Sequence, residues 1–219
     1  MEKPNYQKEL DALLAQLSQR ESVPSLLLHA CCAPCSSYVL ESLSPYFKIT
    51  VFFYNPNISL EKEYRARISE QIRLIREMPA ENPVNFLEGE YVPSDFLSRV
   101  QGMEALPEGG ERCFSCYRLR LEETARRAKA GGFDYFASTL SLSPYKNVQK
   151  LNEIGLTLAR AFQTEWLPND FKKKNGYRRS IELSRQYGLY RQDYCGCIYS
   201  FLQRHPAPQP QENGGPICK

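Results

Sequence analysis

Two spacings of apolar residues alternate along the chain, one typical of helices and the other typical of buried strands. Between residues 8 and 20, leucines recur three, four and seven positions apart, which predicts an amphipathic helix. The apolar run at 25–30 and the β-branched and aromatic run at 49–54 predict buried strands. Residues 34–43 begin with proline, which the first turn of a helix accepts, so we expect a helix between these strands. The three segments predict a β-α-β unit.

The alternation continues as far as residue 167. We expect further helices and strands in the order 60–78, 84–87, 113–130, 133–139, 147–162 and 164–167, of which the second, fourth and sixth are strands. Strands that alternate with helices predict an α/β fold, in which helices flank a mostly parallel sheet. Reactive loops in such sheets follow the carboxyl ends of the strands, so the loops after residues 30, 54 and 139 form the candidate site.

Composition predicts one domain followed by a short tail. We expect residues 1–204 to form a single domain, basic and helical from about residue 171, and residues 205–219, which are rich in proline, to be disordered. Cys218 lies in that tail, where we expect it to be idle. No apolar run reaches the length of a membrane span, and the first residues lack the pattern of an export signal. We therefore expect a cytoplasmic protein without a membrane partner.

The eight cysteines of the chain are the strongest indication of its chemistry. Thiols stay reduced in the cytoplasm, so cysteines in tight groups indicate metal or redox chemistry rather than disulfides. Adjacent cysteines and a Cys-Gly-Cys are not the usual spacings of zinc ligands, and an iron-sulfur centre is favoured over structural zinc. Zinc and plain burial in the core remain alternatives. The grouped cysteines are Cys31, Cys32, Cys35, Cys113, Cys116, Cys195 and Cys197.

Other chemistries find less support in the sequence. The chain contains neither of the glycine-rich motifs that bind nucleotide phosphates, so we expect no nucleotide cofactor. It has two histidines, and His29, at the end of a strand, is expected to be a hydrogen-bonded core residue. The net charge of +3 is too small to indicate a polyanionic partner by itself.

Five motifs, taken together, resemble those of the QueH-type epoxyqueuosine reductases in the same order. They are HACCAPC at 29–35, YNPNI at 54–58, RCFSCYR at 112–118, STLSLSPYK at 138–146 and YCGC at 194–197. The resemblance covers nearly the whole fold and implies a Rossmann-like fold related to the adenine-nucleotide α-hydrolase group. It also implies the last step of queuosine synthesis, in which the epoxide of epoxyqueuosine at the anticodon wobble base of tRNA is reduced to the cyclopentene.

The same resemblance implies the cofactors, which are a four-iron four-sulfur (4Fe-4S) cluster and a nearby additional mononuclear iron. By motif, the ligands of the cluster would be Cys31, Cys32, Cys113 and Cys116. The ligands of the additional iron would be Cys195, Cys197 and Cys35, although some family members have aspartate at the last position. Another route to queuosine uses cobalamin. The chain lacks the Asp-x-His-x-x-Gly motif that often marks cobalamin binding, so we expect no cobalamin.

Removing an epoxide oxygen requires two electrons, protons and a group that polarises the C–O bond. A cluster supplies electrons one at a time, and an iron with an open coordination position acts as a Lewis acid. Three protein ligands leave such a position, so the expected catalytic residues include Cys35, Cys195 and Cys197. The expected proton donor is a metal-bound water, Tyr145 or Tyr194. The expected substrate-binding residues of the same motifs are Asn55, Asn57, Ser141, Ser143 and Lys146.

Residues 171–191 are basic and rich in tyrosine, with seven basic residues against one acidic residue. Basic groups neutralise phosphate and aromatic rings accept unstacked bases, so this segment fits an anticodon loop, although a solvated helix face gives the same pattern. The expected tRNA-binding residues are Lys172, Lys173, Lys174, Arg178 and Arg179. The resemblance implies the tRNAs for aspartate, asparagine, histidine and tyrosine, and it leaves the electron donor unidentified.

Two alternative functions remain at this point. A zinc-stabilised RNA-binding module without catalytic activity would share the basic segment, but it would have no use for a vacant ligand position. A tRNA sulfur-transferase of related fold would use reactive thiols in a similar loop. The absence of a glycine- and serine-rich ATP loop weighs against the transferase.

Overall fold

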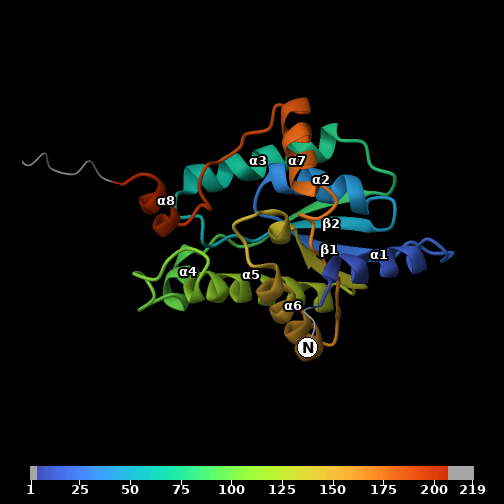
Figure 1. The fold of residues 1–219 in the computed structure, drawn as a ribbon, viewed down its shortest axis with the longest axis horizontal. Helices are drawn as coiled ribbons and strands as arrows, with labels where there is room; N and C mark the ends of the chain where they lie inside the picture. The colour runs from blue at the N-terminus through green and yellow to red at the C-terminus, as the bar shows by residue number, and fades with distance from the viewer. Residues whose placement is uncertain (1–3, 207–219) are drawn as a thin grey trace, which may run out of the picture.

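The computed structural model describes residues 4–206, which fold around one parallel sheet (Figure 1). Its strands are β1 (Ser25–His29), β2 (Lys48–Phe53), β3 (Val84–Glu88), β4 (Tyr135–Ser138) and β5 (Glu165–Trp166). Their order in the sheet is β3-β2-β1-β4-β5, and every neighbouring pair is parallel. The expected α/β fold with a mostly parallel, helix-flanked sheet is confirmed. Its topology is Rossmann-like, because the chain moves outward from β1 on one side and then resumes on the other.

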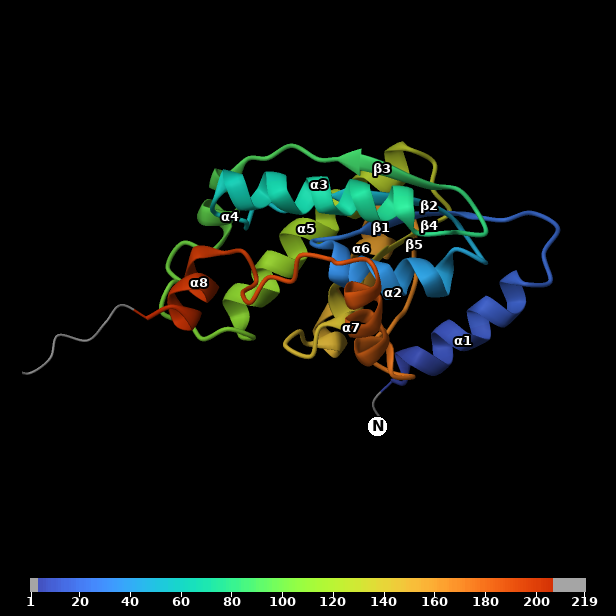
Figure 2. The same ribbon diagram turned by 90° about the horizontal axis from the view of Figure 1, so that it is seen from above.

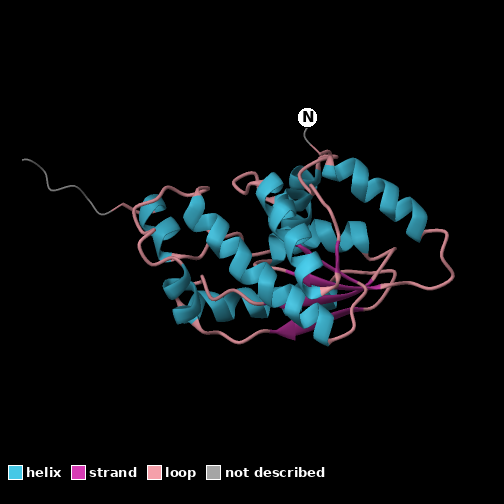
Figure 3. Ribbon diagram, turned by 90° about the horizontal axis from the view of Figure 1, so that it is seen from below, coloured by secondary structure: helices cyan, strands magenta, loops and turns pink. Residues whose placement is uncertain are grey.

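Helices cover both faces of the sheet, and the strands lie between them (Figure 3). Their bounds are α1 (Tyr6–Leu17), α2 (Ala33–Leu43), α3 (Glu61–Glu77), α4 (Pro93–Arg99), α5 (Glu111–Ala130), α6 (Val148–Phe162), α7 (Gly176–Gln186) and α8 (Ile198–Arg204). The alternation of side chains along β1 explains the two layers. Leu26 and Leu28 pack in a core with α1, α2 and α3, whereas Leu27 packs in a second core with α5 and α6.

The carboxyl ends of β1, β2 and β4 lie at one edge of the sheet. The parallel register pairs His29 with both Phe52 and Ser138, so the three following loops begin side by side. Asn55 joins two of these loops, because its amide donates to the carbonyl of Ala30 at 2.8 Å. The reversal of strand order between β1 and β4 therefore lies beside the loops that the sequence predicts to be reactive.

Two short helices beyond the sheet were not singled out from the sequence, although the second lies within the part expected to be helical from about residue 171. The α4 and α8 helices lie together at one end of the molecule (Figures 1 and 2), where the rings of Phe96 and Tyr199 are 6.2 Å apart. Each has seven residues, which is too short for apolar periodicity to mark a helix. A 3-10 turn, η1 (Thr139–Leu142), also follows β4 in place of the last residue of the expected strand. These segments close the end of the fold at which the cysteines gather.

No helix among residues 4–206 is long and apolar enough to cross a membrane. The expected disordered tail falls outside the described residues from position 207 onward, and so does Cys218. The expected single domain and its basic helical part stay predictions.

Candidate active site

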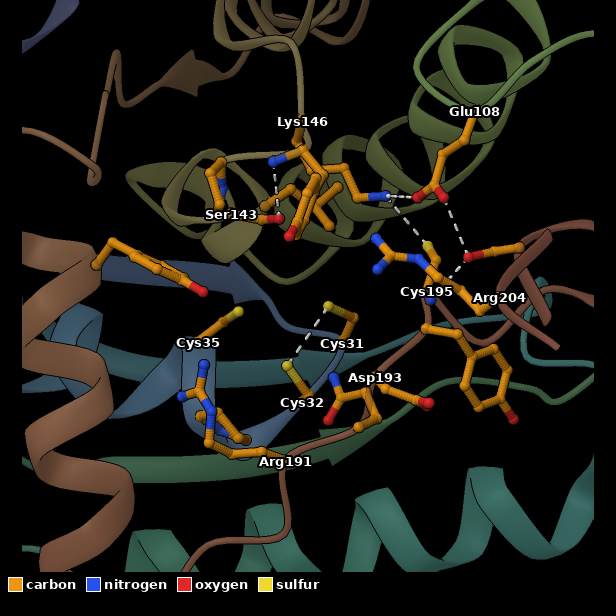
Figure 4. A pocket seen from close by; sticks show the side chains of 18 residues that line it. Cys31, Cys32, Cys35, Glu108, Ser143, Lys146, Arg191, Asp193, Cys195 and Arg204 are labelled. Carbon is orange, nitrogen blue, oxygen red and sulfur yellow. Dashed lines mark hydrogen bonds and ion pairs between the residues drawn. The ribbon is translucent and has the colours of Figure 1, made fainter.

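A pocket of about 130 Å³ opens at the carboxyl edge of the sheet (Figure 4). It lies between the loop after β1, the loop that follows η1, and the segment that leads into α8. A second, very small void of about 10 Å³ adjoins it, since Lys146 and Cys195 line both. The seven described cysteines all line one of these cavities: Cys31, Cys32, Cys35 and Cys195 the first, and Cys113, Cys116, Cys195 and Cys197 the second. The fold thus brings the three groups together.

Helix starts position most of these thiols. Cys32 is the N-cap of α2 in an extended conformation, and Cys35 lies in the first turn of that helix. Cys113 and Cys116 lie one turn apart near the start of α5, and Cys197 is the N-cap of α8, where its sulfur accepts from the Ser200 amide at 3.4 Å. The helices α2 and α5 lie in crossovers between parallel strands, so their starts face the same edge, whereas α8 follows the last strand and is brought there by tertiary contacts.

Among residues 4–206, none of the seven cysteines forms a disulfide. The sulfurs of Cys31 and Cys32 are 3.9 Å apart. Within residues 4–206, no three His, Cys, Asp or Glu side chains are already arranged as ligands of one metal ion. The ligand assignments made from the sequence therefore stay predictions.

Lys146 and Cys195 form the electrostatic centre of the pocket (Figure 4). Lys146 as a residue is 8% exposed, and its ammonium donates to the Cys195 sulfur at 3.2 Å and to the Glu108 carboxylate at 3.4 Å. A hydrogen bond from the Cys197 thiol, followed by the charges of Lys146 and Arg120, holds the pKa of Cys195 well below its usual range despite burial. Burial disfavours the charge on Lys146, but Cys195, Tyr117 and Glu108 together outweigh burial and raise the pKa of Lys146 well above normal. The two side chains form an ammonium–thiolate pair.

The other buried thiols are protonated at neutral pH. Burial raises the pKa of Cys116 to about 11. The pKa of Cys31 is raised well above normal by its hydrogen bond with Cys32 and by burial. A Cys31 hydrogen bond lowers the pKa of Cys32, but the Cys35 hydrogen bond and burial outweigh it and raise that pKa to about 12. Only a bound cation would deprotonate all of these thiols together at neutral pH.

Glu108 links the ammonium to α8. Its second carboxylate oxygen accepts from the Ser200 hydroxyl at 3.2 Å, and the Ser200 oxygen accepts from the Cys195 amide at 3.1 Å. The sequence interpretation missed Glu108, because it lies in a loop of no recognisable pattern. The resulting path from Lys146 through Glu108 to Ser200 keeps the charges beside Cys195 in place.

Arg67, also missed, fixes the segment that carries Cys195 and Cys197. Its buried guanidinium pairs with Glu63 at 2.7 Å and donates to the carbonyl of Cys195 at 3.2 Å. Gly196 has a φ of +110°, and a Cβ on it would lie 2.9 Å from Ile58 and 3.3 Å from Arg67. Only glycine lets the chain turn this tightly against the guanidinium. Nothing in the pattern of α3 distinguishes Arg67 from a surface arginine.

His29 supports the site from below, as the sequence predicted for a core histidine. It is fully buried, with Nδ1 2.9 Å from the Ser138 hydroxyl and Nε2 3.2 Å from the carbonyl oxygen of Tyr54. Burial lowers the pKa of His29 to about 3, so the ring is neutral at pH 7. The carbonyl can only accept, so Nε2–H donates to it and Nδ1 accepts from the Ser138 hydroxyl. His29 therefore joins β1, β2 and β4 directly beneath the cysteine loop.

Of the expected substrate-binding residues, three lie outside the lining of the main pocket and two line it. Asn55, Asn57 and Ser141 are buried; Ser141 donates to Asn169, and Asn57 lines the small void beside the thiols. Ser143 and Lys146 line the pocket, as do the two tyrosines proposed as proton donors. Tyr145 is 61% exposed at the rim, and the Arg204 guanidinium lies 5.1 Å from its ring centre. Tyr194 lies with its ring 5.6 Å from the Arg67 guanidinium, and burial raises its pKa.

The basic segment lies beside the pocket, and much of its charge is paired. Lys174 contacts Asp11 at 2.7 Å, and Arg179 contacts Glu41 at 2.6 Å and Glu182 at 3.3 Å. Arg178 also pairs with Glu182, at 3.4 Å, whereas the Lys172 ammonium donates to the carbonyl of Lys146 at 3.2 Å and Lys173 is exposed. The pocket itself is lined by Tyr177, Arg191 and Arg204 instead of these five.

Comparison of the sequence with known proteins identifies the family of this chain. A family model described as "Epoxyqueuosine reductase QueH" matches residues 26–203. A protein of that name from Streptococcus pyogenes serotype M1 is 46% identical over 203 residues, which cover 90% of this chain and 80% of the relative. A protein of the same name from Staphylococcus epidermidis is 41% identical over 93% of this chain and 87% of its own length. Another from Thermotoga maritima is 33% identical over 82% of this chain and 92% of its own length. The chain therefore belongs to the QueH family of epoxyqueuosine reductases.

Proposed function

We propose that this protein is an epoxyqueuosine reductase, an oxidoreductase that completes queuosine synthesis in tRNA. The reaction takes the epoxide, two electrons and two protons to the cyclopentene and one water. The observation that carries the proposal is the convergence of seven free thiols on one pocket, at the switch point of a parallel sheet. Nothing in the described structure favours the zinc-stabilised RNA-binding module over this reading.

The pocket suits an iron-sulfur centre in its donor set and its charge. Buried thiols offer soft ligands, and the cations of Lys146 and Arg120 beside them offset the negative charge of several thiolates. We assign the 4Fe-4S cluster to Cys31, Cys32, Cys113 and Cys116, and the additional iron to Cys35, Cys195 and Cys197. When bound, the two groups supply electrons singly and a Lewis acid for the epoxide oxygen. No cobalamin or nucleotide is part of the proposal.

Lys146 is the residue best placed to stabilise the negative charge on the epoxide oxygen as it leaves. Its ammonium has a raised pKa and stays charged at neutral pH, and it already donates to Cys195 and Glu108. A hydrogen bond from Nζ stabilises negative charge that develops on the oxygen while the C–O bond breaks. Tyr194 remains a candidate proton donor, since burial raises its pKa and keeps its hydroxyl protonated.

Tyr145 is better placed to stack on a base than to donate a proton. Its ring is exposed at the rim of the pocket with Arg204 beside it. Aromatic faces and guanidinium groups are the surfaces on which proteins hold unstacked bases, and a wobble base must leave its stack to reach the thiols. We place the anticodon loop of the four tRNAs over this rim, with Lys172, Lys173 and Lys174 reaching the flanking phosphates.

The proposal is tested by anaerobic purification and assay. Wild-type protein should contain iron and sulfide and convert epoxyqueuosine in tRNA to queuosine with dithionite as reductant, measured by mass spectrometry of the digested tRNA. Cys195→Ser should abolish conversion, and Cys218→Ser is the matched control that should not. Colourless protein that binds zinc and tRNA without conversion would contradict the proposal and support the RNA-binding module.

A further inference from the structure

Three arginines of this chain are almost fully buried, and two of them have several hydrogen-bond partners each. Arg67 has Glu63 and two backbone carbonyls. Arg112 donates to the carbonyls of Met103, Glu104 and Leu106, and its guanidinium lies 4.5 Å from the ring centre of Tyr199. In both, the charge has a visible structural purpose, because it ties a loop to a helix.

Arg120 has no comparable set of partners. Its side chain is 1% exposed. Its Nε and Nη1 reach the carbonyl of Cys116 and the Oδ1 of Asn55, each at 3.4 Å, and its Nη2 has no hydrogen-bond partner. Among the ion pairs of residues 4–206, none joins Arg120 to a carboxylate. A guanidinium stays protonated in proteins, so a full positive charge is buried here without a carboxylate.

The surroundings of Arg120 show where the missing negative charge belongs. Arg120 lines the small void together with Cys113, Cys116, Cys195 and Cys197. Burial disfavours its charge, but Cys116, Cys195 and Cys31 outweigh burial and raise its pKa. These three cysteines come from the three separate groups that the fold brings together. A buried charge without a partner is strongly destabilising, so the thiolate centre is the counter-ion that this position requires.

We propose that Arg120 is a positioning residue that offsets the negative charge of the thiolate-held centre and thereby sets how readily that centre accepts an electron. The inference rests on the proposed iron-sulfur function. Each one-electron reduction adds one negative charge to the centre, and the electron comes from a low-potential reductant such as dithionite. A fixed cation in a site shielded from water stabilises the reduced form more than the oxidised form. Removing the cation must therefore make the centre harder to reduce.

The test is a redox titration of the iron-loaded protein, followed by its visible and electron paramagnetic resonance spectra. We expect Arg120→Met to lower the equilibrium constant for reduction at least tenfold, which is a shift of about 59 mV to more negative potential for one electron. Arg120→Lys restores a charge at the same place and should recover most of the wild-type potential. Arg118→Met removes the same charge from an exposed position of the same helix, where solvent screens it, and should leave the potential unchanged.

Each outcome decides the matter. Equal potentials for wild type and Arg120→Met at equal iron content would overturn the inference while leaving the proposed function intact. If Arg120→Met loads no iron but Arg120→Lys does, the result supports the role of the positive charge. If neither variant loads iron, the proposed role of the charge is overturned, and the site requires the shape of arginine instead. Wild-type protein that takes up no iron and sulfide would overturn the proposed function, and this inference with it.

Discussion

The buried imidazole of His29 makes the stability of this protein sensitive to acid. His29 lies beneath the cysteine loop with no exposure to solvent, and both ring nitrogens are engaged as in a neutral ring. Burial, and then the positive charge of Arg120, lower its pKa from 6.5 to about 3. In the unfolded chain the ring titrates near pH 6.5. As the pH is lowered, His29 is therefore protonated in the unfolded chain before it is protonated in the folded protein.

The sign and size of the effect follow from this difference in pKa. Below pH 6.5 the unfolded chain binds a proton that the folded protein does not bind until about pH 3, so stability falls as the pH falls through that window. The loss approaches about 1.4 kcal/mol per pH unit. Between pH 7.5 and pH 5.0, His29 alone removes about 2 kcal/mol from the free energy of unfolding.

Urea denaturation of the metal-free, reduced protein at the two pH values measures this loss. His29→Asn removes the titrating ring. Between pH 7.5 and pH 5.0, the free energy of unfolding of the variant should therefore fall by about 2 kcal/mol less than that of wild type, whatever its absolute stability. His29→Gln serves if the asparagine variant does not fold. His205→Asn is the matched control, because His205 is partly exposed beside Asp193 and its removal should preserve the wild-type loss. Equal losses in wild type and His29→Asn would refute the reasoning.

Three further predictions concern the pocket rim, the basic segment and the core. Tyr145→Ala should weaken binding of an anticodon stem-loop about 5- to 150-fold, whereas Tyr145→Phe keeps the stacking face and should bind like wild type in a fluorescence titration. Joint replacement of Lys172, Lys173 and Lys174 by Ala should flatten the dependence of tRNA affinity on salt; an unchanged slope would remove these lysines from the interface. Gly155→Ala places a Cβ 2.2 Å from the Trp166 ring and should lower the free energy of unfolding by about 1–3 kcal/mol in urea denaturation. Loss of the same size in Gly110→Ala, where the nearest atom is 3.4 Å away, would contradict that explanation.

The helices and strands could be predicted from the sequence because their causes are local. The expected helix at 60–78 is observed as Glu61–Glu77, and the expected strand at 84–87 as Val84–Glu88. Apolar spacing, a proline at a helix start and a glycine pair at a helix end act within a few residues. The seven-residue helices α4 and α8 were not predicted as separate elements, because their positions depend on tertiary contacts: α4 packs on α5, and Tyr199 of α8 contacts Phe96 of α4 and Arg112 of α5.

Part of the charge environment also had a signal in the sequence. Arg120 follows Cys113 and Cys116 at spacings of seven and four residues, which places it on their face of α5. This periodicity is present in the sequence, but no role was predicted for Arg120 from it. Arg67 and Glu108 had no such signal, because their partners lie in the distant segment 194–200.

The sequence by itself determined the fold class and the seven grouped thiols, since residue identity and local spacing carry that information. It did not determine which of its charges act on those thiols. The burial of Arg120 without a carboxylate and the contact between Lys146 and Cys195 depend on segments far apart in the chain. The pairing of Lys174 and Arg179 with acidic residues on α1 and α2 likewise depends on where α7 packs. Electrostatic interactions depend on distance and burial, and only the packed tertiary structure sets both.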